Sequence, residues 1–230
     1  MFSTILALTH LGRLQELENE LHQANETLRR VLQLAGEQPG PSANDACLGL
    51  ARICYEWNEL DAARQYAQQS LYLARLYDRA LDRFIITEVF LARLKLAQGD
   101  AAGAAAMLAQ TEQAARQQNF TLRLPEIAAA QVLVLLHEGN LASATQLAGQ
   151  YNLPLTQARV LMSQNDPSAA LALLRPYRQQ MEARSWQDER LRALVLEALA
   201  LAAQRQRDTA LQLLAEALAM AEPGGFIRLF

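Results

Sequence analysis

The sequence predicts an all-α fold in which antiparallel helical hairpins stack side by side. The chain has 230 residues and is rich in alanine and leucine, with only 10 glycines and 7 prolines to form turns. Its hydrophobic fraction is 51% and its charged fraction 20%, which excludes a disordered chain. A short polar turn recurs about every forty residues, which favours a helical solenoid over a β-sandwich or barrel.

The repeated unit is a polar or glycine-containing turn followed by a small residue and an apolar helical run. It occurs at 57–63, 98–104, 138–144, 164–170 and 205–210, and we place an earlier copy at 11–14. The copies end at Ala63, Ala104, Ala144, Ala170 and Ala210, with steps of 41, 40, 26 and 40 residues. Forty residues fit two helices of about four turns and two short loops. We therefore expect one domain, 1–230, of about six hairpins.

Each repeated alanine is expected where the second helix of a hairpin crosses the first, because a larger side chain would hold the axes apart. The Asn, Asp and Gly residues of the turns end one helix and cap the next. The short step of 26 residues predicts a compact hairpin around 151–163, where Pro154 opens or breaks a helix.

The first fifty residues depart from this regular pattern. Residues 14–34 predict one long helix whose leucines pack against the next hairpin or, alternatively, form a dimerising coiled coil. The leucines concerned are Leu14, Leu17, Leu21, Leu28 and Leu32. Residues 36–44 are predicted to form a loop. Cys47 and Cys54 are seven apart, so in a helix their Cα atoms lie about 10 Å apart, which predicts two buried thiols rather than a disulfide.

Several classes of function are excluded by missing motifs. Lys95 is the one lysine and no glycine-rich loop precedes it, so the chain has no P-loop for nucleotides. The histidines and cysteines do not follow the spacings of zinc sites, and no catalytic constellation emerges. We expect no enzyme, no metal and no cofactor in this chain. The net charge of −3 argues against direct nucleic-acid binding, and no apolar stretch is long enough for a membrane span.

The repeat resembles the tetratricopeptide repeat, which implies a right-handed superhelix. In the second hairpin, Leu50, Ala51 and Tyr55 occupy the Leu-Gly/Ala and aromatic positions of the first helix, and Ala63 and Ala67 occupy small positions of the second. Further matches are Ser70, Leu91, Ala92, Ala104, Leu108, Ala198, Ala210 and Ala217. The repeat is longer than usual, and in this alignment Leu17 and Val132 stand where a small residue is common.

Residues 75–78, 90–94, 98–100 and 114–116, together with the ending 216–230, resemble the helical region of large ATP-binding LuxR-type transcription regulators, the MalT-like group. The resemblance implies a cytoplasmic sensor domain, a fragment of a larger regulator, that binds an inducer or an inhibitory partner and controls DNA binding by the full-length protein. ATP is expected only in a separate domain, and self-association is possible. The alternative is a stand-alone tetratricopeptide-like scaffold that binds a peptide or partner protein.

Candidate ligand-binding residues follow from the expectation that the first helices line the concave surface. Alignment on the alanines places Arg52, Arg93 and Arg159 at equivalent positions, alongside Leu133 and Leu199. The remaining candidates near this surface are Tyr55, His137, Met162 and Arg192. The arginines either bind carboxylate or phosphate groups of an anionic effector or each pair with a neighbouring Glu or Asp. Trp57 and Trp186 are expected to pack in the core or in loops.

Overall fold

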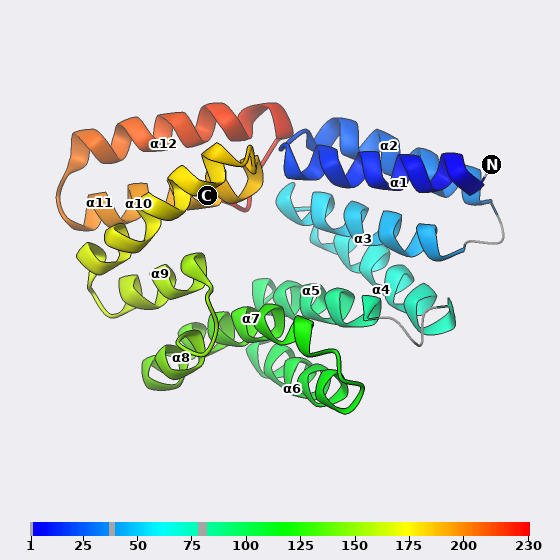
Figure 1. The fold of residues 1–230 in the computed structure, drawn as a ribbon, viewed down its shortest axis with the longest axis horizontal. Coiled ribbons are helices and arrows are strands. Elements are labelled where there is room, and N and C mark those ends of the chain that lie inside the picture. The colour runs from blue at the N-terminus through cyan, green and yellow to red at the C-terminus, as the bar shows by residue number, and fades with distance from the viewer. Residues whose placement is uncertain (1, 37–39, 78–81) are drawn as a thin grey trace.

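The computed structural model describes residues 2–36, 40–77 and 82–230, in which helices joined by short turns are present and no strand occurs (Figure 1). The helices are α1 (Phe2–Leu17), α2 (Leu21–Ala35), α3 (Pro41–Glu56), α4 (Leu60–Tyr77), α5 (Arg83–Ala97), α6 (Ala101–Gln117), α7 (Leu124–His137), α8 (Leu141–Ala148), α9 (Pro154–Ser163), α10 (Pro167–Ala183), α11 (Gln187–Ala203) and α12 (Arg207–Ala221). Two 3-10 turns, η1 (Thr121–Arg123) and η2 (Glu222–Gly224), complete the described elements. None of the described helices combines the length and the apolar character that crossing a bilayer requires.

The helices pair into successive hairpins, α1 with α2 through α11 with α12, as the sequence predicts. The odd-numbered helices form an inner layer, because each contacts the next odd-numbered helix from α1 to α11. Helix α11 also contacts α1, so this layer closes on itself into a ring (Figure 1). The predicted fold class, a tetratricopeptide-like superhelix of stacked antiparallel hairpins, is confirmed, and the ring closure is a feature that the sequence did not predict.

The turn within each hairpin has the same backbone geometry in all six pairs. One residue adopts a left-handed conformation with φ between 61° and 85°, which glycine and asparagine tolerate best. These residues are Asn19, Asn58, Gly99, Gly139, Asn165 and Arg205. The next amide bonds back to the carbonyl five residues earlier, as in Glu59 N to Cys54 O at 2.8 Å. This Schellman motif explains why the repeated turns are polar and short.

The repeated alanines lie in the core, as predicted. Ala63, Ala104, Ala144 and Ala170 are fully buried, and Ala210 is 6% exposed. The short step between the third and fourth of these alanines arises because α8 has eight residues and α9 has ten. Pro154 is the first residue of α9, which confirms that it opens a helix.

The prediction of one long helix over residues 14–34 is wrong. Helix α1 ends at Leu17 and α2 begins at Leu21, with the left-handed residue Asn19 between them. The first repeat turn therefore lies at 17–24 rather than at 11–14, and its buried alanine is Ala24. Gly12 is inside α1, where an added Cβ would lie 2.6 Å from a methyl carbon of Leu28. The sequence contained a glycine here because two helices approach closely, not because the chain turns.

Leu21, Leu28 and Leu32 pack in the core next to the following hairpin, as the first interpretation stated, and the five leucines do not form a continuous seam. Leu21 and Leu28 are buried in the core between α2 and α3. Leu14 is 50% exposed. The coiled-coil alternative requires one uninterrupted helix, and the break at Asn19 removes it.

The predicted loop 36–44 is shorter than expected, because α3 already begins at Pro41. Proline suits this first helical position, because an N–H group there would have no acceptor within the helix. Residues 37–39 lie outside the described residues, as does residue 78 of the family-like segment 75–78. Cys47 and Cys54 are buried, unpaired thiols on α3, as predicted. Burial raises the pKa of Cys47 to about 12 and that of Cys54 to about 11.

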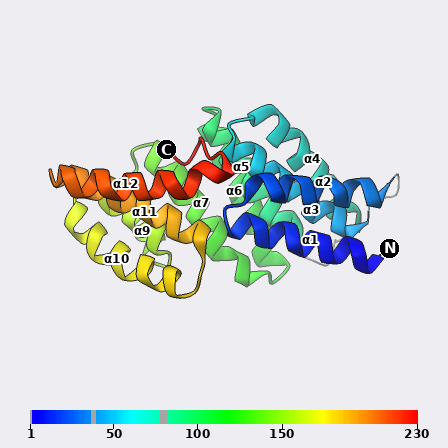
Figure 2. The ribbon, with the colours of Figure 1, turned by 90° about the horizontal axis from the view of Figure 1, so that it is seen from above.

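The segment after α12 closes the ring by folding onto the second hairpin. The indole N–H of Trp57 donates to the carbonyl of Gly224 at 2.8 Å, and the amides of Ile227 and Arg228 both donate to the carbonyl of Glu56. Phe226 packs against the core of α2 and α3 and also against that of α11 and α12. Consequently α12 and α2 lie end to end in both views (Figure 2). The packing role predicted for Trp57 is confirmed.

Candidate functional site

The ring encloses a central cavity of about 1130 Å³, lined mainly by the inner, odd-numbered helices. A smaller cavity of about 280 Å³ adjoins it where α3 and α5 end and the C-terminal segment crosses. Six residues line both spaces: Tyr55, Glu56, Arg93, Leu133, Arg159 and Arg192. The inner surface is therefore concave and continuous, and its character is set by the charged side chains described below.

With the first turn at Asn19, the alignment on the buried alanines includes a fourth arginine. The position eleven residues before each buried alanine holds Arg13, Arg52, Arg93, Leu133, Arg159 and Leu199 in successive hairpins. All four of these arginines line the central cavity. Leu199 does not line it and is 54% exposed. Arg13 was missed from the sequence because the turn that sets its register was placed inside α1.

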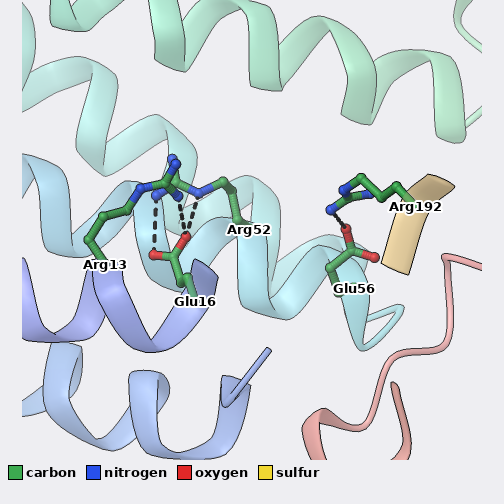
Figure 3. A network of polar contacts seen from close by, with 5 residues as sticks. All are labelled: Arg13, Glu16, Arg52, Glu56 and Arg192. Atoms are coloured by element: carbon green, nitrogen blue, oxygen red, sulfur yellow. Dashed lines mark hydrogen bonds and ion pairs between the residues drawn. The ribbon is translucent and has the colours of Figure 1, made fainter. Parts of the chain in front are cut away.

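Two of the aligned arginines share one buried carboxylate (Figure 3). Arg52 donates to Glu16 through Nε at 2.8 Å and Nη2 at 3.1 Å, and Arg13 donates to the same group at 2.8 Å. The Glu16 side chain is 7% exposed. It passes so close to α3 that a Cβ on Gly49 would lie 2.5 Å from its oxygen. Burial alone would lower the pKa of Arg52, but the charge and hydrogen bonds of Glu16 raise it above its ordinary value.

A second ion pair joins the last hairpin to the second. Arg192 of α11 donates to Glu56 at the end of α3 at 2.9 Å (Figure 3). Burial acts to lower the pKa of Arg192, but the Glu56 carboxylate raises it above its ordinary value. Because the carbonyl of Glu56 also accepts the amides of Ile227 and Arg228, this one residue binds both α11 and the C-terminal segment.

The other two aligned arginines have no carboxylate partner in the part of the chain that the structure describes. Within residues 2–36, 40–77 and 82–230, no Asp or Glu oxygen lies within 4 Å of the guanidinium of Arg93 or Arg159. Burial, together with the positive charges of Arg93 and Arg192, lowers the pKa of Arg159 to about 10. The guanidinium carbon of Arg93 lies 5.8 Å from the centre of the Tyr55 ring. Two cations are thus left to face the cavity, which favours an anionic occupant.

The start of α11 brings two acidic residues, Asp188 and Glu189, to the cavity lining, and the charge of Glu189 acts to raise the pKa of Arg159 against the larger effect of burial. The hydroxyl of Tyr177 donates to Glu189 at 2.7 Å, and burial together with this contact raises the pKa of Tyr177. Burial and the neighbouring Glu189 also raise the pKa of Asp188. No group of three or more His, Cys, Asp and Glu side chains suited to a metal ion occurs in the part of the chain that the structure describes.

Five of the seven predicted site residues line the cavity, namely Arg52, Tyr55, Arg93, Arg159 and Arg192. The other two do not lie on its lining. His137 is the last residue of α7 and is exposed. Met162 packs against the core cluster that includes Ala158 and Leu174.

Sequence reasoning missed residues that reach the site through tertiary contacts. Arg228 comes from the C-terminal segment, donates to Asn58 at 2.9 Å and places its guanidinium 4.9 Å from the Tyr55 ring centre. No helical periodicity marks this segment, so no sequence signal was available for it. Trp186, predicted to pack, is 49% exposed, lines the cavity and lies beneath Arg184.

Comparison with protein families agrees with a helical repeat. The family model described as MalT-like TPR region matches residues 1–230. Two crystal structures of nearly identical TPR-like repeats, from a Podosopora anserina protein described as a kinesin light chain, are each 20% identical to the chain. Each match covers 94% of this chain and 93% or 94% of the other, with TM-scores of 0.39 and 0.40. No curated protein sequence matched.

Proposed function

The chain belongs to the family of MalT-like TPR regions, and we propose that it is the effector-sensing and partner-binding domain of a MalT-like, LuxR-family transcription regulator. In this proposal an inducer or an inhibitory protein binds the domain and changes the ability of the full-length protein to bind DNA. ATP binding and DNA contact belong to other domains of that cytoplasmic protein. This chain itself acts by binding, without catalysis or a cofactor of its own.

The observation that carries the proposal is the central cavity with its unpaired arginines. Ligand sites are concave and combine apolar walls with a few convergent polar groups. The cavity of about 1130 Å³ has this composition, since Phe90, Leu133 and Leu155 line it together with Arg93 and Arg159. Cations without a carboxylate partner are costly to bury, and an occupant that pairs with them would offset this cost.

The ring closure supplies a way for binding to be transmitted. The contacts that close the ring are few and polar, apart from Phe226, so an open and a closed form can differ by a modest free energy. A ligand that contacts residues on both sides of the closure binds the closed form better and shifts the population towards it. The C-terminal segment takes part in the closure, which makes it the element that responds.

The alternative is a stand-alone scaffold that binds a peptide tail, and the closed inner layer argues against it. An extended peptide would have to thread through the ring, because α11 contacts α1 and leaves no open groove between them. The gene provides a direct test of the two proposals. A P-loop encoded upstream and a helix-turn-helix encoded downstream support the regulator, and their absence supports the scaffold.

The binding role is tested by filling the cavity without changing its charge. A panel of metabolites is screened by thermal shift against the protein and against Ala129→Trp, whose side chain would enter the cavity from α7. A ligand at a hundred times its Kd stabilises the folded state by about 2.7 kcal/mol. We expect ligands to raise the Tm of the unchanged protein and of the control Ala142→Trp, exposed on α8, but not of Ala129→Trp. Equal shifts in all three proteins would place binding elsewhere.

A further inference from the structure

The smaller cavity collects positive charge in a chain whose net charge is −3. Its lining holds four arginines, Arg93, Arg159, Arg192 and Arg228, which we call the arginine pocket. Glu56 is the one carboxylate among the described lining residues, so the formal charge of the pocket is +3. The remaining lining is Tyr55, Leu96, Ala97, Leu133 and Leu229. Like charges gathered in a small, partly apolar space repel one another, so the pocket has a strong positive potential.

The charges of the arginine pocket are not neutralised from within. Glu56 is occupied by Arg192 at 2.9 Å. Arg228 bonds a neutral amide oxygen of Asn58 and lies over the Tyr55 ring, and its buried Nε has no hydrogen-bond partner. Arg93 also lies near that ring. Arg159 makes no side-chain contact with a carboxylate in the described residues.

We infer that the arginine pocket binds a small oxyanion with two or more negative charges, in which phosphate or carboxylate groups accept hydrogen bonds from Arg93, Arg159 and Arg228. The inference rests on the proposed binding role of the cavity and names the chemistry of its ligand. Guanidinium groups present several N–H donors in a plane and match both anion types with charge-assisted bonds. A volume of about 280 Å³ admits a small ligand, while the central cavity leaves room for an attached uncharged portion.

The arginine pocket also lies across the ring closure. Arg93 and Arg159 come from α5 and α9, whereas Arg192 comes from α11 and Arg228 from the C-terminal segment. An anion that bridges these elements would hold the C-terminal segment against α3. Its binding would therefore slow the opening of the bonds from the amides of Ile227 and Arg228 to the carbonyl of Glu56.

Isothermal titration calorimetry with pyrophosphate and with succinate tests the inference, with sodium chloride at matched ionic strength as the reference. We expect saturable binding of at least one of the two anions. Arg159→Gln and Arg93→Gln should each weaken it about tenfold, since each removes a charge-assisted pair. The control Arg207→Gln removes an exposed arginine at the start of α12 and should leave the affinity unchanged. Tighter binding of pyrophosphate identifies a phosphate ligand, and tighter binding of succinate a carboxylate ligand.

Hydrogen exchange provides a second measurement on the same proteins. The bound anion should slow exchange of the Ile227 and Arg228 amides in the unchanged protein and in Arg207→Gln, but not in Arg159→Gln. The inference is overturned if neither anion shows saturable binding. It is also overturned if Arg159→Gln binds the anion as tightly as the unchanged protein. If the anions fail while uncharged ligands still distinguish Ala129→Trp from Ala142→Trp, the proposed function stands and its ligand is not an anion.

Discussion

Arg52 and Arg159 occupy the same position in their repeats but have opposite electrostatic surroundings. Arg52 shares the buried carboxylate of Glu16 with Arg13. Arg159 has no carboxylate within 4 Å among the described residues, and the positive charges of Arg93 and Arg192 lower its pKa more than the charge of Glu189 raises it. In the first two hairpins the inner arginines thus pair with a carboxylate of the first hairpin. In the third and fifth hairpins the inner arginines face the cavity without such a partner.

The partner of each inner arginine depends on the preceding hairpin. Glu16 stands three residues after the aligned position of the first hairpin, and it pairs with Arg52 of the second. The equivalent residue of the second hairpin is Tyr55, whose ring lies near Arg93. In the fourth hairpin it is Leu136, which offers no charge to Arg159. The position of each inner arginine follows from the repeat. Whether that arginine has a carboxylate partner depends on one side chain of the preceding hairpin.

Removing the shared carboxylate should have the largest effect on this comparison. Glu16→Gln leaves Arg13 and Arg52 without a negative charge at a buried site, which should lower the free energy of unfolding by about 3 kcal/mol. Urea denaturation measures the change. Glu18→Gln, two residues away and exposed, is the matched control and should have little effect. A loss similar to that of the control would show that Arg52 needs no partner.

Removing the unpaired charge should act in the opposite direction. Arg159→Met replaces a half-buried cation by an apolar side chain of similar length and should raise the free energy of unfolding by about 1 kcal/mol at pH 7. Burial lowers the pKa of Arg159 to about 10 from 12.5. The folded state therefore releases this proton before the unfolded state does, so between these pH values the stability of the unchanged protein rises with pH.

It follows that the advantage of Arg159→Met is complete below pH 10 and shrinks as the pH rises above it. Urea denaturation at pH 7 and at pH values above 10 measures both parts of this expectation. Destabilisation by Arg159→Met at pH 7 would mean that Arg159 has a stabilising partner, as Arg52 does, and that the surroundings of the two arginines do not differ in this respect.

The smallest effect is expected at Arg93, which has an aromatic neighbour in place of a carboxylate. Arg93→Gln should change the free energy of unfolding by about 0.5 kcal/mol, the size of a partly solvated cation–π contact. A double-mutant cycle with Tyr55→Leu isolates this contact. A coupling energy as large as that between Arg52 and Glu16 would place Arg93 with the paired arginines instead.

Much of the fold could be predicted because packing repeats along the chain. Ala63, Ala104, Ala144 and Ala170 are buried where the repeated turns place them, and Pro154 begins a helix as its fixed φ favours. The first hairpin was misread because Gly12 imitates a turn signal. Gly12 instead allows α1 to approach Leu28 of α2 closely, and the turn lies at Asn19. A residue type alone does not distinguish these two uses.

The candidate site was predictable only in part. The alignment identifies Arg52, Arg93 and Arg159 as inner residues, and the structure places all three on the cavity. It could not separate them into paired and unpaired groups. Arg228 and Glu56 entered the site through the ring closure, which joins segments about 170 residues apart in sequence, as in the bond from Arg228 to Asn58.

By itself, the sequence determined the hairpins from the second onward and the inward position of Arg52, Arg93 and Arg159, because these follow from local periodicity, turn chemistry and contacts between neighbouring repeats. The tertiary structure decided that the superhelix closes into a ring, which arginines find a carboxylate and where positive charge remains. Closure depends on the sum of small rotations over six hairpins and on contacts such as those of Phe226 with both ends. No local pattern in the chain encodes that sum.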